Sequence, residues 1–171
     1  MALSIKPYIE NKERIHLIGI GGVSMNSLGE LLLSRGVPIS GSDRLRTDVT
    51  ARLEALGAKI TYEHKPENVE GASLIVRTAA VHDDNPEIVR AHELGIPVME
   101  RAEAWGHLMR DYDNAVCLAG THGKTTSTSV TVKLASVMST LLAVSTSTRA
   151  AGSTEVYLTF TPKSLPRRSA K

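Results

Sequence analysis

The chain of 171 residues has a single cysteine, Cys117, so no disulfide can form within it. Proteins this poor in cysteine are typical of reducing compartments. Cys117 lies in an apolar run, which indicates a core residue rather than a nucleophile. No apolar run approaches the roughly 20 residues of a membrane-spanning helix, and the N-terminal segment lacks the apolar centre of a signal peptide. The sequence therefore predicts a cytoplasmic protein without a membrane partner.

A strong excess of one charge is also missing. The net charge is +2, but residues 134–171 alone contribute +4 while residues 1–133 contribute −2. The excess of basic residues therefore belongs to the C-terminal segment and not to the rest of the chain. On this basis we expect no nucleic-acid partner.

Short apolar runs alternate with amphipathic stretches through much of the chain. The runs predict strands at residues 15–19, 37–43, 58–62, 73–78, 96–100 and 114–120. Helices are expected at residues 22–36, 47–57, 85–95 and 101–110, with Thr47 or Asp48 and the pair Asn85-Pro86 as start signals and Gly36, Gly57 and Gly95 as stop signals. Alternation at a spacing of about twenty residues is typical of a parallel sheet with helices on both faces. We predict an α/β fold with a Rossmann-like, doubly wound parallel sheet.

The segment GIGGVSMNS, Gly19 to Ser27, follows the first predicted strand and opens a helix. Backbone N–H groups in such a turn, together with the helix N-terminus, can hold a pyrophosphate. Gly21 and Gly22 allow close approach to phosphates because they carry no Cβ atom. Asp43, after the second strand, stands where an acidic residue commonly contacts a ribose hydroxyl. The full dinucleotide fingerprint requires glycine where this chain has Ser24, so a plain strand-to-helix turn beside a solvated aspartate is the alternative.

A second glycine-rich segment, GTHGKTT at Gly120 to Thr126, follows the last predicted strand. Its Gly-Lys-Thr matches the end of the phosphate-binding P-loop pattern, although Leu118 stands at that pattern's first glycine. N–H groups around Gly123 can cradle phosphate oxygens, Lys124 can reach the terminal phosphates, and Thr125 can offer its hydroxyl to Mg²⁺. The alternative is a capped helix with a solvated lysine, and the histidine between the two glycines, taken alone, indicates a solvated loop residue.

The two loops stand among other recognisable segments, namely HLIGIGGVSMNSLGELLLSRG, ISGSD, NPE, IPVMERAE and AGTHGKTTSTS. Together these segments resemble the Mur ligase family, and the shortened loop with Thr-His before Gly-Lys-Thr-Thr is highly specific to it. The resemblance covers about residues 10–133. It is strongest to members that join L-alanine to UDP-N-acetylmuramate with ATP in peptidoglycan precursor synthesis, through an acyl phosphate on the lactyl carboxylate.

The resemblance implies roles for individual residues. The UDP sugar would be bound by Gly19, Gly21, Gly22, Ser24, Asp43, Thr78 and Ala79. ATP would be bound by Gly120, Thr121, His122, Gly123, Lys124, Thr125 and Thr126, with Lys124 as the catalytic residue and Thr125 as the ligand of Mg²⁺. The family shows Ser-Ser-Ala where this chain has Thr78-Ala79-Ala80, so a hydroxyl is lost at residue 79 and the contact with the UDP phosphates would be weaker.

The resemblance also implies a division into three parts. Residues 1–110 would form the UDP-sugar-binding domain, and residues 111–134 the first strand, P-loop and helix of a truncated ATP-binding domain. Beyond residue 133 the family carries magnesium ligands, adenine-binding residues and a C-terminal amino-acid domain, none of which this sequence contains. We therefore expect a fragment of the ligase that lacks the L-alanine site and is non-catalytic by itself.

Residues 135–171 form an aberrant tail in this interpretation. The last 38 residues hold seven serines, six threonines and one acidic residue. Read in one shifted frame, codons possible for VMSTLLAV can encode an apolar strand ending in Gly-Gly, and codons for FTPKSLP can encode Pro-Lys-Ile-Ala, both of which resemble family segments after the P-loop. We hypothesise a tail translated out of frame, and expect it to be disordered or irregular. A natural low-complexity tail is the alternative.

Two other functions remain open at this point. A related ligase that attaches a recycled tripeptide to the same UDP sugar shares both loops. A nicotinamide-dependent dehydrogenase shares the first loop, but its fold predicts a second half of the sheet and no Gly-Lys-Thr.

Overall fold

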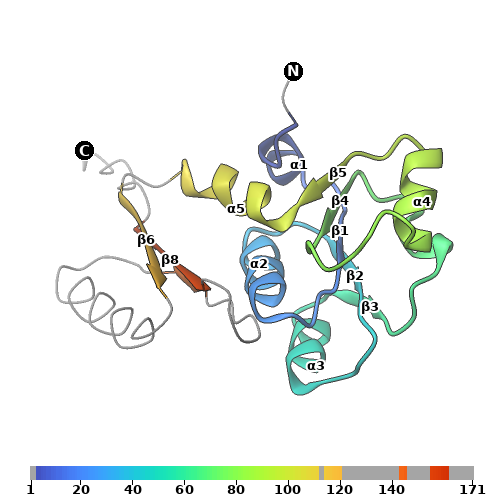
Figure 1. The fold of residues 1–171 in the computed structure, drawn as a ribbon, viewed down its shortest axis with the longest axis horizontal. Coiled ribbons are helices and arrows are strands. Elements are labelled where there is room, and N and C mark those ends of the chain that lie inside the picture. Colours follow the sequence, from blue (N-terminus) through green and yellow to red (C-terminus); the bar gives the residue numbers. More distant parts are fainter. Residues whose placement is uncertain (1–2, 112–113, 121–142, 146–154, 162–171) are drawn as a thin grey trace, which may run out of the picture. The chain divides into compact units, whose positions relative to one another are not determined.

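The computed structural model describes residues 3–111, 114–120, 143–145 and 155–161 (Figure 1). The chain divides into two compact units, Met1–His107 and Leu108–Lys171. The first unit contains a five-stranded sheet, and the second contains a three-stranded sheet.

The sheet of the first unit is parallel throughout, with the strand order β3-β2-β1-β4-β5. Its strands are β1 (Ile15–Ile18), β2 (Ile39–Ser42), β3 (Lys59–Thr61), β4 (Leu74–Arg77) and β5 (Val98–Glu100). Central β1 pairs with β2 on one side and with β4 on the other. This arrangement confirms the predicted Rossmann-like sheet, in which the chain returns to the middle after β3 and continues outward in the other direction.

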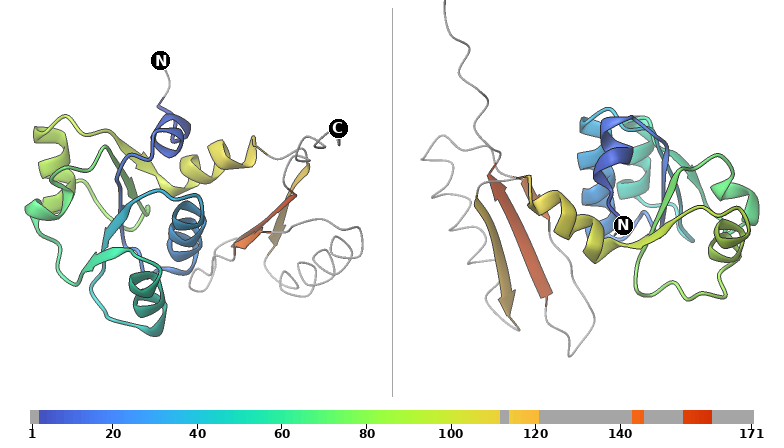
Figure 2. Two further views of the ribbon diagram at one scale, coloured as in Figure 1. Left: turned by 180° about the vertical axis from the view of Figure 1, so that it is seen from behind. Right: turned by 90° about the horizontal axis from the view of Figure 1, so that it is seen from above.

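Helices cover both faces of this sheet (Figures 1 and 2). Helices α2 (Val23–Ser34) and α3 (Asp48–Ala55) lie on one face, while α4 (Pro86–Glu93) and the 3₁₀ helix η1 (Pro66–Val69) lie on the other. The other helices in the described part of the chain are α1 (Lys6–Glu10) and α5 (Arg101–Met109). The sequence pattern predicted α2 to α5 but missed α1 and η1, each of which is a single short turn or little more.

The core consists of two layers because side chains alternate along each strand. Leu17 points to α2 and α3, where its Cδ1 atom would be 3.3 Å from a Cβ atom on Gly29. Ile18 points the other way and packs in a buried cluster with Ile75 and Ile88. All four residues of β1 and of β2 are buried, as expected for strands with both faces covered.

Helix ends follow the predicted signals. The Thr47 side chain accepts a hydrogen bond from the Thr50 N–H group at the start of α3, and the Asn85 side chain accepts one from the Glu87 N–H group at the start of α4. Three glycines just after helices have positive φ, namely Gly36 at 74°, Gly57 at 103° and Gly95 at 67°. A left-handed residue after the last helical turn is the usual helix stop, and glycine adopts it without strain.

The second unit contains β6 (Asn114–Gly120), β7 (Ala143–Ser145) and β8 (Glu155–Thr161) in the order β6-β8-β7, with both pairings antiparallel. Strand β6 was predicted, but β7 and β8 lie in the tail that we expected to be irregular, so that expectation was wrong for these two segments. The run of Val, Tyr, Leu, Thr and Phe in β8 has high β-propensity, and its pairing gives the backbone groups of β6 hydrogen-bond partners. The domain roles and the hypothesis of a shifted frame stay predictions.

Candidate functional site

The point where the chain changes direction in the sheet creates a crevice at the carboxyl ends of β1 and β4. These strands are neighbours, yet the helices that follow them lie on opposite faces of the sheet. The loops after them therefore diverge, and ligands of open α/β sheets bind at such a place. Gly19 follows β1 with φ of +80°, and a Cβ atom there would lie 3.3 Å from the Cγ2 atom of Thr78, which follows β4. A side chain larger than hydrogen at residue 19 would therefore strain the turn and crowd the crevice.

A cavity of about 750 Å³ occupies this end of the sheet. Its wall includes the residue after β1, the loop after β2, one histidine that follows β3, and the loop from β4 to the start of α4. The lining residues are Gly19, Asp43, Arg44, Leu45, His64, Thr78, Ala80, Val81, His82, Asp84, Asn85 and Pro86. Its volume is in the usual range of small-molecule and cofactor sites.

The glycine loop after β1 is held in place by Asp43. The Oδ2 atom of Asp43 accepts a hydrogen bond of 2.8 Å from the Gly21 N–H group. Its Oδ1 atom accepts hydrogen bonds from the backbone N–H groups of Arg44 at 2.7 Å and Leu45 at 3.3 Å. A Cβ atom on Gly21 would lie only 2.8 Å from Oδ2, so this approach requires glycine. The carboxylate thus links the two loops that form one wall of the cavity.

The N-terminus of α2 follows directly after this glycine loop. Gly22 is its N-cap residue in an extended conformation (φ −66°, ψ 140°), and no side chain caps the helix. The N–H groups of the first turn have no partner within a helix, and the helix dipole places partial positive charge there. Such an end favours an anion, as the sequence pattern predicted for this loop.

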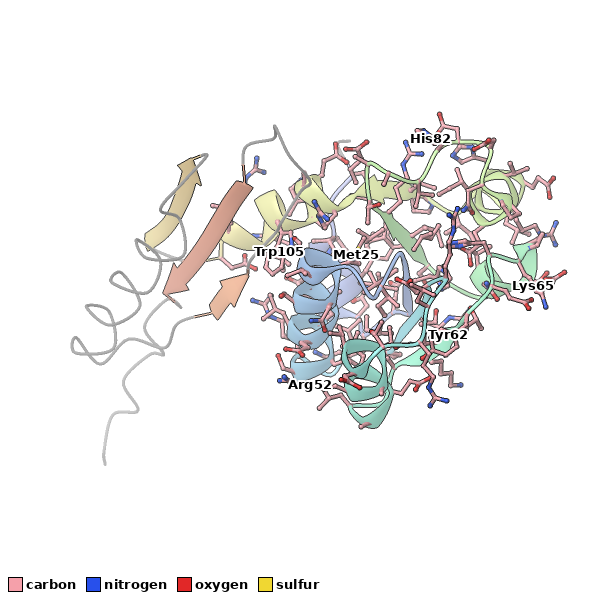
Figure 3. All side chains as sticks on the ribbon, turned by 60° about the horizontal axis from the view of Figure 1, so that its bottom comes forward. Met25, Arg52, Tyr62, Lys65, His82 and Trp105 are labelled. Carbon is pink, nitrogen blue, oxygen red and sulfur yellow. The ribbon has the colours of Figure 1, made fainter. Side chains whose placement is uncertain are left out.

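The loop after β4 forms the opposite rim of the cavity. The Arg77 guanidinium bonds the Asp83 carboxylate at 2.5 Å and the Val81 carbonyl at 3.3 Å, and the Thr78 hydroxyl accepts a bond of 3.3 Å from the Ala80 N–H group. These three contacts hold the turn that presents Thr78 to the cavity. Figure 3 shows His82 on the outer part of this loop.

Beneath the cavity lies a cluster of buried polar side chains around Glu87, the second residue of α4. Its Oε2 atom accepts hydrogen bonds from Ser42 at 2.7 Å and from the Nδ1 atom of His64 at 3.0 Å, and its Oε1 atom accepts one of 2.5 Å from Asn68. The Glu87 side chain is completely buried, whereas that of His64 is 17% exposed. His64 is therefore the member of the cluster that reaches the cavity wall.

A second histidine stands behind this cluster. His16 on β1 is fully buried, and its Nδ1 atom lies 2.9 Å from the Ser40 hydroxyl. Its Nε2 atom lies 3.6 Å from Oε1 of Glu87, an ion-pair distance too long for a hydrogen bond. Within the part of the chain that the structure describes, this Nε2 atom has no hydrogen-bond partner.

Glu87 is held in its ionised form. Burial raises its pKa, but the polar groups around it, with His16 first and then Asn68, Ser42 and His64, together lower the pKa from the ordinary 4.5 to about 2. Each of these groups favours the carboxylate over the carboxylic acid because it donates to the charged oxygens or attracts their charge. Loss of any one of these polar partners would leave the buried charge of Glu87 less well compensated and would cost stability.

The low pKa of Glu87 predicts an acid-labile fold. Stability from this group is fully present above the ordinary pKa of 4.5 and is lost as the pH falls from there toward the folded-state pKa of about 2. Lowering the pH from 6 to 3 should therefore remove about 2 kcal/mol from the free energy of unfolding through Glu87 alone. Urea unfolding of the wild type and of Glu87→Gln at both pH values gives the loss of unfolding free energy in each protein. The contribution of Glu87 is the loss in the wild type minus the loss in the variant. Equal losses in the two proteins would contradict the assignment.

The structure brings some of the predicted residues together. Gly19, Asp43 and Thr78 line the cavity, and Gly21 is bonded to Asp43. Gly22 is the N-cap of α2, Ser24 is 6% exposed within the first turn of that helix, and Ala79 is exposed on the loop after β4. Of the predicted ATP site, Gly120 ends β6, and Thr121 to Thr126, including Lys124 and Thr125, lie outside the described residues.

Sequence reasoning missed the polar cluster. Glu87 was given no role beyond its place in the predicted helix 85–95 and in the family segment NPE, and His16, Ser40, Ser42 and His64 were not singled out. One signal was present: His16, Ser40 and Ser42 share one face of two strands that are otherwise apolar, and buried polar side chains require partners.

Two other kinds of feature are absent from the described residues. No group of three or more His, Cys, Asp or Glu side chains is placed to hold a metal ion there. None of the helices in that part of the chain is long and apolar enough to cross a membrane.

A parallel α/β sheet with a glycine loop, an uncapped helix N-terminus and a cavity at the change of direction is an arrangement typical of nucleotide-binding domains. Residues 14–113 match the family described as "Mur ligase family, catalytic domain". The chain belongs to the Mur ligase family.

Two similar proteins share the same name. A UDP-N-acetylmuramate–L-alanine ligase from Alkaliphilus metalliredigens is 51% identical over 118 residues, which are 69% of this chain and 26% of that protein. A ligase of the same name from Clostridium novyi is 47% identical over 121 residues, which are 71% of this chain and 26% of that protein. The chain thus spans about a quarter of the length of these relatives.

Solved structures agree on the fold. The crystal structure of a UDP-N-acetylmuramate-alanine ligase from Thermotoga maritima matches with a TM-score of 0.55 and 37% identity, over 58% of this chain and 23% of that one. A murein peptide ligase from Psychrobacter arcticus matches with a TM-score of 0.66 at 22% identity, over 74% of this chain and 27% of that one, and shows the fold alone. Membership of the Mur ligase family overturns the dehydrogenase alternative.

Proposed function

We propose that the first unit binds UDP-N-acetylmuramate as part of an ATP-dependent ligase that joins this substrate to L-alanine in peptidoglycan precursor synthesis. The observation that carries the proposal is the cavity of about 750 Å³ at the change of direction in the sheet, next to the uncapped N-terminus of α2. A nucleotide sugar has a diphosphate in its middle and two polar ends. The cavity and the helix end suit that combination because one is large and lined by both polar and apolar groups, and the other favours anions.

The residues of the first unit have separate tasks in this proposal. The α2 N-terminus, with Gly22 and Ser24, faces the diphosphate, and Asp43 holds the Gly21 N–H group so that the loop keeps its shape. Thr78 and Ala79 border the same ligand from the opposite rim. These residues bind and orient the sugar nucleotide, while bond formation belongs to the ATP-binding part.

The ATP-binding part of the proposal concerns residues 120–126. Lys124 would contact the terminal phosphates of ATP, and Thr125 would bind Mg²⁺, with Gly120, Thr121, His122, Gly123 and Thr126 completing the loop. ATP with Mg²⁺ supplies the phosphoryl group that activates a carboxylate for attack by an amine. We place the protein in the cytoplasm, where both nucleotides occur.

The recycling ligase that attaches a tripeptide remains the second candidate for the amine substrate. The murein peptide ligases share the fold at low identity, whereas the relatives near 50% identity are named as alanine ligases. We therefore favour L-alanine.

The diphosphate site can be tested at Gly22, the N-cap residue of α2. Replacement of Gly22 by Asp should lower affinity for UDP-N-acetylmuramate at least about tenfold, because a carboxylate there competes with and repels the diphosphate. The fold should persist, because Gly22 is an N-cap with negative φ and Asp is a favoured N-cap residue. Isothermal titration calorimetry measures the affinity, and thermal unfolding measures the stability.

The matched control is Gly22→Asn, which has nearly the same shape and the same capping ability without the charge. A Cβ atom at residue 22 would lie 3.3 Å from the Gly19 carbonyl oxygen in both variants, so any steric effect is shared. The aspartate variant should bind more weakly than the asparagine variant, and the difference should shrink at high salt. Equal affinity of the two variants would place the diphosphate elsewhere.

We also propose that the 171-residue chain alone does not ligate L-alanine. Phosphoryl transfer depends on positioned metal ions and phosphate contacts, and the relatives continue for about three times the length that this chain matches. A phosphate-release assay with ATP, Mg²⁺, UDP-N-acetylmuramate and L-alanine tests this. Release that requires both the sugar nucleotide and L-alanine would refute it.

A further inference from the structure

Glu87 and His64 form a connection between the buried interior and the cavity. We propose that Glu87 is a positioning residue for the sugar-nucleotide site: its carboxylate fixes the ring of His64 with Nδ1–H toward the interior, so that a cationic His64 presents Nε2–H to an anionic oxygen of the bound ligand. The identity of the ligand, a diphosphate-bearing nucleotide sugar, rests on the proposed function.

The orientation of His64 follows from its contacts. Its Nδ1 atom lies 3.0 Å from Oε2 of Glu87 and 3.2 Å from the Ser42 hydroxyl. An ionised carboxylate only accepts hydrogen bonds, so the proton between His64 and Glu87 belongs to Nδ1. The Nε2 atom lies on the opposite edge of the ring, and His64 is part of the cavity wall. In the ligand-free protein this selects the Nδ1–H tautomer for the neutral ring.

The carboxylate is itself immobilised, so the ring is oriented before a ligand arrives. Ser42 from β2 and Asn68 from η1 donate to it, and Asn85 accepts a hydrogen bond from the Glu87 backbone N–H group. Three segments thus fix Glu87, and Glu87 with Ser42 fixes His64. A preorganised donor loses less conformational entropy on binding, which is where a positioning residue contributes affinity.

The charges around His64 favour an anionic ligand at its outer edge. An imidazolium between the Glu87 carboxylate and a phosphate oxygen makes a charge-assisted hydrogen bond on each side. Beside it in the chain, Lys65 and Glu63 pair with each other at 2.5 Å. The other charged or titratable groups nearby are Asp43, Arg44, His82 and Asp84 on the cavity wall and His16 behind Glu87.

Binding should therefore depend on pH in a defined direction. A ligand that binds cationic His64 binds together with a proton, so affinity should rise as the pH falls. Glu87, with a pKa of about 2, stays ionised from pH 6 to pH 8 and contributes no slope of its own. The wild type should bind UDP-N-acetylmuramate several-fold more tightly at pH 6 than at pH 8.

The test is calorimetric titration of UDP-N-acetylmuramate into the full 171-residue chain at pH 6 and pH 8. His64→Gln and Glu87→Gln should each lose about tenfold to hundredfold in affinity at pH 6 and should lose the pH dependence. Because Glu87 acts through His64, the double variant should bind no more weakly than His64→Gln alone. His82→Gln, which removes another imidazole of the cavity wall without a contact to Glu87, should keep the pH dependence.

Additive losses in the double variant, or a pH dependence that disappears in His82→Gln and persists in His64→Gln, would overturn the inference while the proposed function stands. Failure of the wild type to bind the sugar nucleotide would overturn the proposed function. In that case imidazole ¹⁵N spectra of the ligand-free chain still decide the positioning: neutral His64 should carry its proton on Nδ1, and a proton on Nε2 with bare Nδ1 overturns the inference.

Discussion

Replacement of Glu87 by Ala should lower the free energy of unfolding by about 3–5 kcal/mol, the cost of breaking a buried charged network by removal of one member. The side chain is fully buried and accepts hydrogen bonds from Ser42, His64 and Asn68. Alanine leaves these donors in the interior without an acceptor and leaves a void where the carboxylate was. Urea unfolding followed by circular dichroism measures the loss.

A matched control lies on the same helix. Glu93 ends α4, its side chain is 57% exposed, and it pairs with Arg90 at 3.0 Å on the surface. Its replacement by Ala should change the free energy of unfolding by less than about 1 kcal/mol, because exposed ion pairs contribute little. Losses of similar size in Glu87→Ala and Glu93→Ala would mean that the cluster is not a structural centre.

The contrast between these two glutamates shows which features of α4 the sequence alone could predict and which it could not. Periodicity predicts α4 well, since Ile88 and Ala91 mark its apolar face. Glu87 precedes Ile88 and is four residues before Ala91, so it lies on the same buried face, although a glutamate in a first turn is most simply interpreted as a solvated acid at a helix N-terminus. Its burial depends on which strand residues meet α4, and that is settled by tertiary pairing.

For the strands, too, some features could be predicted from the sequence and others could not. Their order and direction follow from alternation, short connections and the usual handedness of crossovers. The register of β1 against β2, which places His16 beside Ser40, is not encoded in either segment alone. Only with that register does the polar face under the cavity become visible, and with it the reason for polar residues in buried strands.

The glycine loop was predicted as a place for phosphates, but the task of Asp43 was not. Position in the chain suggested a contact with a ribose hydroxyl, while the structure shows its carboxylate bonded to three backbone N–H groups, including that of Gly21. Such hydrogen bonds depend on how two loops approach each other. The signal in the sequence was the absence of a side chain at Gly21, which permits that approach.

Gly41, in the middle of β2, packs closely against β1 and the loop that follows β1. A Cβ atom there would lie 2.6 Å from Cδ1 of Ile20, 2.9 Å from its Cβ atom and 2.8 Å from the carbonyl oxygen of Leu17. The methyl group of Ile20 can rotate away, but its Cβ atom moves only if the chain between β1 and α2 moves, and the Leu17 oxygen moves only if β1 itself shifts. That chain contains Gly19 and Gly21, so the sheet and the candidate site share this contact.

Gly41→Val should therefore lower the free energy of unfolding by more than about 3 kcal/mol, at or beyond the upper end of the usual cost of overpacking. The opposite result is expected for Gly106→Ala, because Gly106 lies within α5 and a Cβ atom there would meet nothing within 4 Å. Alanine in a helix is more favourable than glycine by about 0.5–1 kcal/mol, so this variant should be more stable than the wild type. Thermal and urea unfolding of both variants compare the two positions. A Gly41→Val protein as stable as the wild type would mean that β2 and the loop after β1 do not pack as tightly as these contacts require.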